Sequence, residues 1–250
     1  MYQESESIWQ GRKLMVLLPA YKTMNPHTHH SLFVNYAKYG PDQIGLEFQP
    51  LTLAHEARNI LMDRALKNSS AETFIFCDDD MILPIGREDY MNVKHNAKLP
   101  TQVAGRLAFE RIMSHGRDKG IVSALYFARN GAGKAVCKDG YDGPISNKKL
   151  HTFVRDGLIP QLWTGMGFVK IERWVIEKMK KAIDEGKWPD CKPMMPGSWY
   201  GYFNILSTAV GEDASFCVRA HEIGINTWLD AGLVCLHAGE MFFGPANTSY

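Results

Sequence analysis

Short apolar runs alternate with helical segments through the first half of the chain, and this alternation restricts the fold most. The runs KLMVLLPAYK at residues 13–22, TFIFC at 73–77 and GIVSALYFAR at 120–129 have long apolar cores, as strands buried on both faces of a parallel sheet do. A further extended run, IGLEFQPL, covers residues 44–51. Strands that alternate with helices predict an α/β fold with a mostly parallel, Rossmann-like central sheet flanked by helices.

Two helices are predicted from spacing. The first follows the run at 44–51, begins behind a possible N-cap at Thr52, and has an apolar stripe at helical spacing. The stripe consists of Ala54, Ala57, Leu61 and Ala65. The second helix lies at 172–186 and ends at Gly186. Its apolar side carries Trp174, Ile176, Met179 and Ile183.

Size and composition exclude several classes of protein. The chain has 250 residues, of which 45% are hydrophobic and 22% charged, so a globular α/β protein is expected. A net charge of +1 provides no general attraction to nucleic acid or acidic membranes. The five cysteines contain no C-x-x-C pair, which disfavours a disulfide framework or zinc ribbon. With no secretory signal and no apolar run near about 20 residues, we expect a cytoplasmic protein without a transmembrane segment.

Three aspartates, Asp78, Asp79 and Asp80, follow the run TFIFC directly. On an extended backbone alternate side chains share a face, so we expect Asp78 and Asp80 to point together and Asp79 to point away. Two carboxylates on one side suit Mg²⁺ or Mn²⁺, and open α/β sheets bind ligands beyond the carboxyl ends of their strands. The alternative is a solvated turn with an aspartate that caps the next helix.

Two later segments could complete such a site. In GEDASFCVRAHEIG, at 211–224, the apolar stripe places Asp213 on the inward side of the first helical turn. Glu212 and Asp213 could simply favour the helix dipole, or one of them could be a general base. His237 ends an apolar run, where a histidine is either structural or a metal ligand.

Common phosphate-binding motifs are missing. No G-x-G-x-x-G follows the first strand, and RNGAGK lacks P-loop spacing because Ala128 stands five positions before Gly133. Gly165 and Gly167 in TGMGF predict a turn or a close approach to a ligand. The histidines of NPHTHHS lack an evident fourth ligand, so we interpret them as part of a solvated loop. They are His27, His29 and His30.

Two segments have an irregular composition. Residues 129–150 are rich in Gly, Lys and Asp and predict a hairpin or loop excursion. Residues 187–204 hold three prolines and five aromatics in 18 residues, which predicts a functional loop. Its aromatic side chains could stack on a sugar or base, close over a ligand, or pack in the core. They include Trp188, Trp199, Tyr200 and Tyr202.

In this order the segments resemble the GT-A glycosyltransferases, in particular the family 2 type that uses nucleotide-diphosphate sugars. The resemblance runs from about residue 13 to 238. It rests on VLLPAYK, EARNILMDRAL, FIFCDDDMILP, WTGMGFVKIER, GEDASFCVRAHEIG and CLHAG. It implies one GT-A domain over residues 1–250, with a donor-binding half at about 13–128 and an acceptor and catalytic half at about 129–250.

The resemblance also implies roles for single residues. Asp78 and Asp80 of the DxD-type motif, with His237, would hold Mn²⁺ or Mg²⁺, and Asp213 of the ED pair, beside Glu212, would be the catalytic base. The nucleotide-sugar donor would be bound by residues at the first-strand exit, on the Arg-Asn helix, in the aspartate motif and at the glycine turn. These are Pro19, Ala20, Tyr21, Arg58, Asp78, Asp79, Gly165 and Gly167.

The resemblance therefore implies a metal-dependent hexosyl- or pentosyltransferase that takes a sugar from a UDP-sugar or related donor. Direct displacement with Asp213 as base predicts inversion, while retaining enzymes share the same scaffold. The acceptor could be a glycan, a small molecule, a protein or a hydroxylated DNA base of the kind modified in bacteriophages. Two alternatives are a sugar-phosphate nucleotidyltransferase, which normally needs a glycine-rich loop where this chain has PAYKT, and a non-catalytic nucleotide-sugar binding protein.

Overall fold

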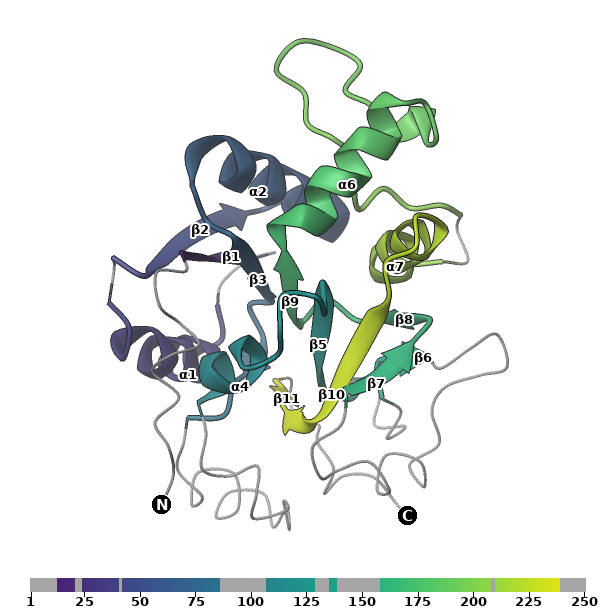
Figure 1. The fold of residues 1–250 in the computed structure, drawn as a ribbon. Helices are drawn as coiled ribbons and strands as arrows, with labels where there is room; N and C mark the ends of the chain where they lie inside the picture. Colours follow the sequence, from purple (N-terminus) through teal and green to yellow (C-terminus); the bar gives the residue numbers. More distant parts are fainter. Residues whose placement is uncertain are drawn as a thin grey trace.

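A seven-stranded sheet forms the centre of the molecule (Figure 1). The computed structural model describes residues 13–20, 24–40, 42–85, 107–128, 135–138, 158–207 and 210–238. The strand order is β2-β1-β3-β9-β5-β10-β7. In chain order the strands are β1 (Leu14–Ala20), β2 (Ile44–Pro50), β3 (Thr73–Cys77), β5 (Ile121–Leu125), β7 (Leu158–Gln161), β9 (Phe168–Glu172) and β10 (Thr227–Val234).

The sheet is mostly parallel, as predicted. Strand β1 runs parallel to β2 and β3, and β10 runs parallel to β5. Strand β9 is antiparallel to both β3 and β5, and β7 is antiparallel to β10. Because β9 lies between two strands from the first half of the chain, the two predicted halves interleave in one sheet. The prediction of a single mixed α/β fold with flanking helices is confirmed.

Helices cover both faces of this sheet (Figure 1). Helices α2 (Ala54–Asn68), α6 (Arg173–Asp184) and α7 (Glu212–Glu222) share one apolar cluster, to which they contribute Leu61, Met179 and Phe216. Helices α1 (Pro26–Ala37) and α4 (Ala108–Met113) contribute Leu32 and Phe109 to a second cluster. The two clusters lie on opposite faces because alternate strand residues point to opposite sides.

Short elements complete the structure. Strands β4 (Met81–Ile82) and β11 (Leu236–His237) pair with each other, as do β6 (Cys137–Lys138) and β8 (Trp163–Thr164). A 3₁₀ helix, η2, spans Pro189–Cys191. Across the described ranges, no helix combines the length and the apolar character needed to cross a membrane.

Two local predictions are wrong. Leu53, not Thr52, is the N-cap of α2, and no side chain caps that helix. The three histidines near residue 28 belong to helix α1 rather than to a loop. Asn25 accepts a hydrogen bond from the His27 amide, and Pro26 occupies the first turn, where proline costs no hydrogen bond. Both residues are helix-start signals.

Other local predictions hold or fall outside the described residues. Helix α2 buries Ala57, Leu61 and Ala65 as its spacing indicates, whereas Ala54, predicted in the same stripe, is exposed. Helix α6 ends before Gly186, whose φ of 87° lies in the left-handed region. All five cysteines are buried and free, in accord with the predicted lack of disulfides. Most of the excursion at 129–150 lies outside the described ranges.

Candidate active site at the carboxyl edge of the sheet

A pocket of about 460 Å³ opens at the edge where strands β1, β3 and β5 end. Ligands of open α/β sheets bind at this edge because the loops that follow parallel strands meet there. Most of the predicted donor, metal and catalytic residues line the pocket. The lining consists of Pro19, Ala20, Thr52, Ala54, Ala57, Arg58, Asp78, Asp79, Asp80, Tyr126, Ala128, Val136, Glu212, Asp213 and His237.

The three aspartates lie in a turn, which corrects the prediction of an extended backbone with Asp79 facing away. Strand β3 ends at Cys77, and the chain turns at residues 78–80 before β4. The backbone of each aspartate is held separately. The Asp78 amide donates to the Gly167 carbonyl at 2.8 Å, the Asp79 carbonyl accepts from Asn25, and the Asp80 carbonyl accepts from Ala238. As a result all three aspartates line the pocket.

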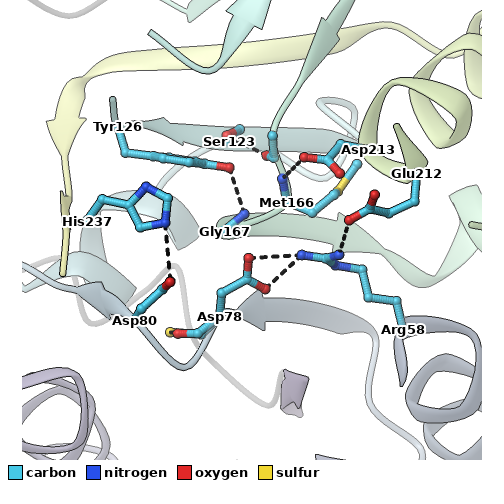
Figure 2. Close-up of polar contacts among 12 residues, drawn as sticks. Arg58, Asp78, Asp80, Ser123, Tyr126, Met166, Gly167, Glu212, Asp213 and His237 are labelled. Atoms are coloured by element: carbon cyan, nitrogen blue, oxygen red, sulfur yellow. Dashed lines mark hydrogen bonds and ion pairs between the residues drawn. The ribbon is translucent and has the colours of Figure 1, made fainter. Parts of the chain in front are cut away.

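Arg58 connects the aspartate turn to helix α7 (Figure 2). Its guanidinium is 3% exposed and donates to both carboxylate oxygens of Asp78, at 2.7 and 2.9 Å. The other terminal nitrogen donates to Glu212 at 2.7 Å. A planar fork of donors can bridge two carboxylates in this way, which a lysine ammonium does poorly. Arg58 therefore joins two segments that are far apart in the sequence.

Asp213 and Glu212 lie in the first turn of α7 and differ in their surroundings. Burial raises the pKa of Asp213 to about 7, with a further contribution from the negative charge of Glu212, although Arg58 opposes the shift. Burial by itself would raise the pKa of Glu212, but the positive charge of Arg58 and hydrogen bonds with Asp213, the backbone and Arg58 together lower it. The amide of Met166 donates to Asp213 at 3.3 Å. A carboxyl group with a pKa near neutrality in a pocket is suited to accept a proton.

His237 and Asp80 face each other at ion-pair distance. The Nδ1 atom of His237 lies 3.1 Å from the Phe127 carbonyl, which can only accept, so Nδ1 carries a proton. The other ring nitrogen, Nε2, lies 3.3 Å from Asp80 Oδ1. In the neutral imidazole both of these facing atoms are acceptors. A metal ion that takes both atoms as ligands relieves that opposition, and a histidine fixed through Nδ1 is typical of metal ligands.

The predicted metal set of Asp78, Asp80 and His237 is brought together only in part. Asp78 is turned toward Arg58, and across the described ranges no three histidine, cysteine, aspartate or glutamate residues are arranged to hold a metal ion. Burial raises the pKa of Asp78 to about 6 in spite of Arg58. Asp80 and His237 nevertheless fit a divalent cation, because Mg²⁺ and Mn²⁺ commonly take one or two protein ligands and complete their shell with substrate phosphates.

The charges of the pocket are strongly unbalanced. Among the described residues, five carboxyl groups line it, and the arginine that lines it with them is already paired with two of these groups. Such a surface repels a free phosphate group and attracts divalent cations. The pocket is thus chemically suited to an anionic ligand only if a cation accompanies it.

The predicted glycines do not line the pocket but lie behind Tyr126. A Cβ atom on Gly165 would overlap the Tyr126 hydroxyl, and one on Gly167 would lie 2.9 Å from Tyr126 Cζ. Both positions therefore require glycine because of this ring. Their role in donor binding stays a prediction, and Tyr21 lies outside the described residues.

The aromatic residues of 188–203 lie away from the pocket lining. Trp188 is 9% exposed and donates to Glu222, and Tyr202 is fully buried in the cluster with α6 and α7. Tyr200 donates to Asp184, while Trp199 is 40% exposed. The core-packing alternative therefore describes Trp188 and Tyr202, and the structure gives no support to an acceptor role for them.

Tyr126 lines the pocket with a polar group but was not predicted from the sequence. It follows β5 directly, and the same rule that located the aspartates after β3 applies to the end of this strand. Because Tyr126 continues an apolar run, its sequence resembles the end of a buried strand and contains no polar signal. Only the neighbouring turn with Gly165 and Gly167 shows that the ring faces the site.

No protein-family model and no curated protein matches the sequence. Among solved structures, A197 from STIV is similar over 93% of both chains, with 14% identity and a TM-score of 0.52. This likeness shows a shared fold.

Two other solved structures are more distant. GalNAc-T7 with UDP, GalNAc and Mn²⁺ matches 92% of this chain and 43% of its own length, at 11% identity and a TM-score of 0.48. Glucosyl-3-phosphoglycerate synthase from Mycobacterium tuberculosis, with Mn²⁺ and UDP-glucose, matches 94% of this chain and 75% of its own length, at 12% identity and a TM-score of 0.39. At such TM-scores these likenesses carry no conclusion about this chain.

Proposed function

We propose that this protein is a metal-dependent glycosyltransferase that moves a sugar from a nucleoside-diphosphate sugar, most simply a UDP-sugar, to an acceptor hydroxyl. One observation carries the proposal. The aspartate turn, the ED pair and His237, from three distant parts of the chain, converge on one acidic pocket at the carboxyl edge of the sheet. The sequence segments that contribute these residues resemble segments of the GT-A enzymes and occur in the same order.

Asp213 is the proposed base. Its raised pKa of about 7 keeps the carboxyl near half-ionised at neutral pH, so it can take the proton of an acceptor hydroxyl. The acceptor oxygen then bonds to the anomeric carbon while the bond from that carbon to the diphosphate oxygen breaks, and the nucleoside diphosphate leaves. General bases of this kind contribute on the order of 10²- to 10⁴-fold to the rate. Attack opposite the leaving group inverts the anomeric carbon.

Asp80 and His237 are the proposed protein ligands of Mn²⁺ or Mg²⁺. When bound, such a cation offsets the charge that builds on a diphosphate leaving group. The Phe127 carbonyl fixes the ring of His237 so that Nε2 faces Asp80. Asp78 has a different immediate partner, Arg58, and would reach the cation or the ribose only if that pair loosens.

Arg58 is proposed to hold the carboxylates in place rather than to bind phosphate. Both of its terminal nitrogens already donate to Asp78 and Glu212. The donor would then lie between Pro19 and Ala20 on one side and the aspartate turn on the other. Free, buried cysteines agree with a protein of a reducing compartment, such as the cytoplasm.

A donor screen tests this function. The purified chain is incubated with a panel of UDP- and GDP-sugars, with Mn²⁺, Mg²⁺ or EDTA, and released nucleotide is measured. We expect release from at least one donor that requires the metal and falls at least about 100-fold in Asp213→Asn, in line with the loss of a general base. Product NMR then gives the anomeric configuration. Release that is equal in EDTA, or unchanged by Asp213→Asn and Asp80→Ala, would overturn the proposal.

A further inference from the structure

Tyr126 stands where the main parts of the pocket meet (Figure 2). It is 4% exposed, yet it belongs to the pocket lining, directly after the end of β5. Neither of the functional groups of this side chain, the hydroxyl and the ring, takes part in the chemistry described above. Each of them contacts a different part of the site.

The hydroxyl of Tyr126 fixes the turn at 165–167. The Gly167 amide donates to the Tyr126 oxygen at 2.9 Å, and the lack of side chains at Gly165 and Gly167 is what leaves room for the ring. Ser123 adds a second tie, since its hydroxyl lies 3.3 Å from the Gly165 carbonyl. Because Gly167 is buried, its amide would lack this acceptor without the Tyr126 hydroxyl, and a buried donor without a partner is unfavourable.

The same turn holds the carboxylate side of the site. The Gly167 carbonyl accepts from the amide of Asp78, and the Met166 amide donates to Asp213. Two consecutive residues, Met166 and Gly167, thus contact the proposed base on one side and both Tyr126 and the aspartate turn on the other. A shift of the turn moves both carboxyl groups, and a misplacement of about 1 Å can reduce a rate on the order of 100-fold.

The ring of Tyr126 packs against His237. The two ring centroids are 5.6 Å apart, and the planes meet at 85° in an edge-to-face contact. Together with the hydrogen bond to Phe127 O, this contact restricts the rotation of the imidazole that faces Asp80. The ring therefore restrains His237, a proposed metal ligand, whereas the hydroxyl restrains the turn that contacts Asp213, the proposed base.

We propose that Tyr126 is a positioning residue. Its hydroxyl holds the turn at 165–167, which contacts Asp213 and Asp78, and its ring holds the imidazole of His237 in place. The catalytic part of this inference rests on the proposed function, but the structural part does not. The two roles can be separated by substitution. Tyr126→Phe removes only the hydroxyl, while Tyr126→Leu removes the ring as well.

Tyr202 provides a matched control. Its ring is fully buried, it lies in the core cluster outside the pocket lining, and its hydroxyl has no hydrogen-bond partner within the described ranges. Tyr202→Phe therefore deletes an equally buried hydroxyl without touching the turn. Thermal unfolding of each variant confirms that measurements are made on folded protein.

The experiment combines kinetics with two NMR readouts on the full chain. For Tyr126→Phe we expect a kcat lower by about 10- to 100-fold, with the donor KM and the Mn²⁺ affinity within about threefold of Tyr202→Phe. Amide exchange at Gly167 should be faster in the Phe variant. For Tyr126→Leu we expect weaker Mn²⁺ binding in addition, and ¹⁵N shifts of His237 that report a mixture of ring tautomers.

Every outcome decides the matter. If Tyr126→Phe matches Tyr202→Phe in kcat and in Gly167 exchange, the positioning role is wrong. If KM rises while kcat is unchanged, the hydroxyl binds substrate directly and the inference is also overturned. If the wild type shows no metal-dependent turnover, the proposed function fails. The Gly167 amide exchange and the His237 spectra still decide whether Tyr126 positions the turn at Gly167 and the ring of His237.

Discussion

Arg58 is a buried cation shared by two carboxylates from distant segments. Loss of one partner of a buried ion pair costs about 3–5 kcal/mol, because the remaining charge is left uncompensated. We expect Arg58→Met to lower the free energy of unfolding by an amount of this order, measured by urea denaturation at pH 7. Arg58→Lys should recover only part of it, since an ammonium cannot bridge Asp78 and Glu212 with the same geometry.

Arg64 offers the control for this prediction. It lies on the exposed side of the same helix, so Arg64→Met should change the stability by less than about 0.5 kcal/mol. Equal losses in Arg58→Met and Arg64→Met would show that the buried guanidinium does not hold the two segments together.

Asp213 should make stability depend on pH. Its pKa is 3.8 in the ordinary case and about 7 in the folded protein, so the folded state binds the proton more tightly than the unfolded state. The resulting stabilisation is complete below about pH 4 and is lost as the pH rises toward 7. We expect Asp213→Asn to gain stability relative to the wild type over this range, by on the order of 1–4 kcal/mol.

Urea denaturation in EDTA at several pH values between 4.5 and 8 measures this difference. EDTA removes divalent cations, which would otherwise change the charge of the pocket. A difference between the wild type and Asp213→Asn that is the same at every pH would show that the carboxyl titrates normally in the folded protein.

At the level of elements, Asn59 ties helix α2 to the segment after η2. Its carbonyl oxygen accepts from the Phe203 amide at 2.9 Å, and its nitrogen donates to Asn204 at 3.0 Å. Asn59→Ala leaves the buried Phe203 amide without an acceptor, so we expect a loss of about 1–3 kcal/mol in the free energy of unfolding. Asn68→Ala, at the exposed end of the helix, is the control. Unchanged amide exchange at Phe203 in Asn59→Ala would contradict this anchor.

The elements with a strong local signal could be predicted from the sequence. Apolar runs located β1, β3 and β5, and the stripe with Leu61 located α2. The turn at residues 78–80 could not be derived by strand alternation, because its course is set by contacts from Asn25, Gly167 and Ala238. Those partners are distant in sequence, so a local rule contains no information about them.

For the site, the residue types were predictable but their pairing was not. Acidic triplets, an acidic pair at a helix start and a histidine after an apolar run are visible locally. The engagement of Asp78 by Arg58, and the burial of Trp188 and Tyr202 in the core, depend on how helices pack on the sheet. Tyr126 was missed for the same reason, since its role exists only through the turn at Gly167.

At the scale of the whole molecule, a sheet with interleaved halves brings an acidic cluster to one edge in a chain of net charge +1. The near-neutral net charge of the chain therefore gives no indication of the strongly negative local potential at this edge. Such a local field attracts cations and repels anions. The proposed function requires that the donor enter together with a divalent cation.

Calorimetric titration of UDP into the protein tests this central claim most directly. The titration is carried out with Mn²⁺ and with EDTA, for the wild type and for Asp80→Asn. Because the pocket repels an unaccompanied diphosphate, we expect binding with Mn²⁺, at least about tenfold weaker binding in Asp80→Asn, and no detectable binding in EDTA. UDP binding of equal strength in EDTA and in Mn²⁺ would contradict the account.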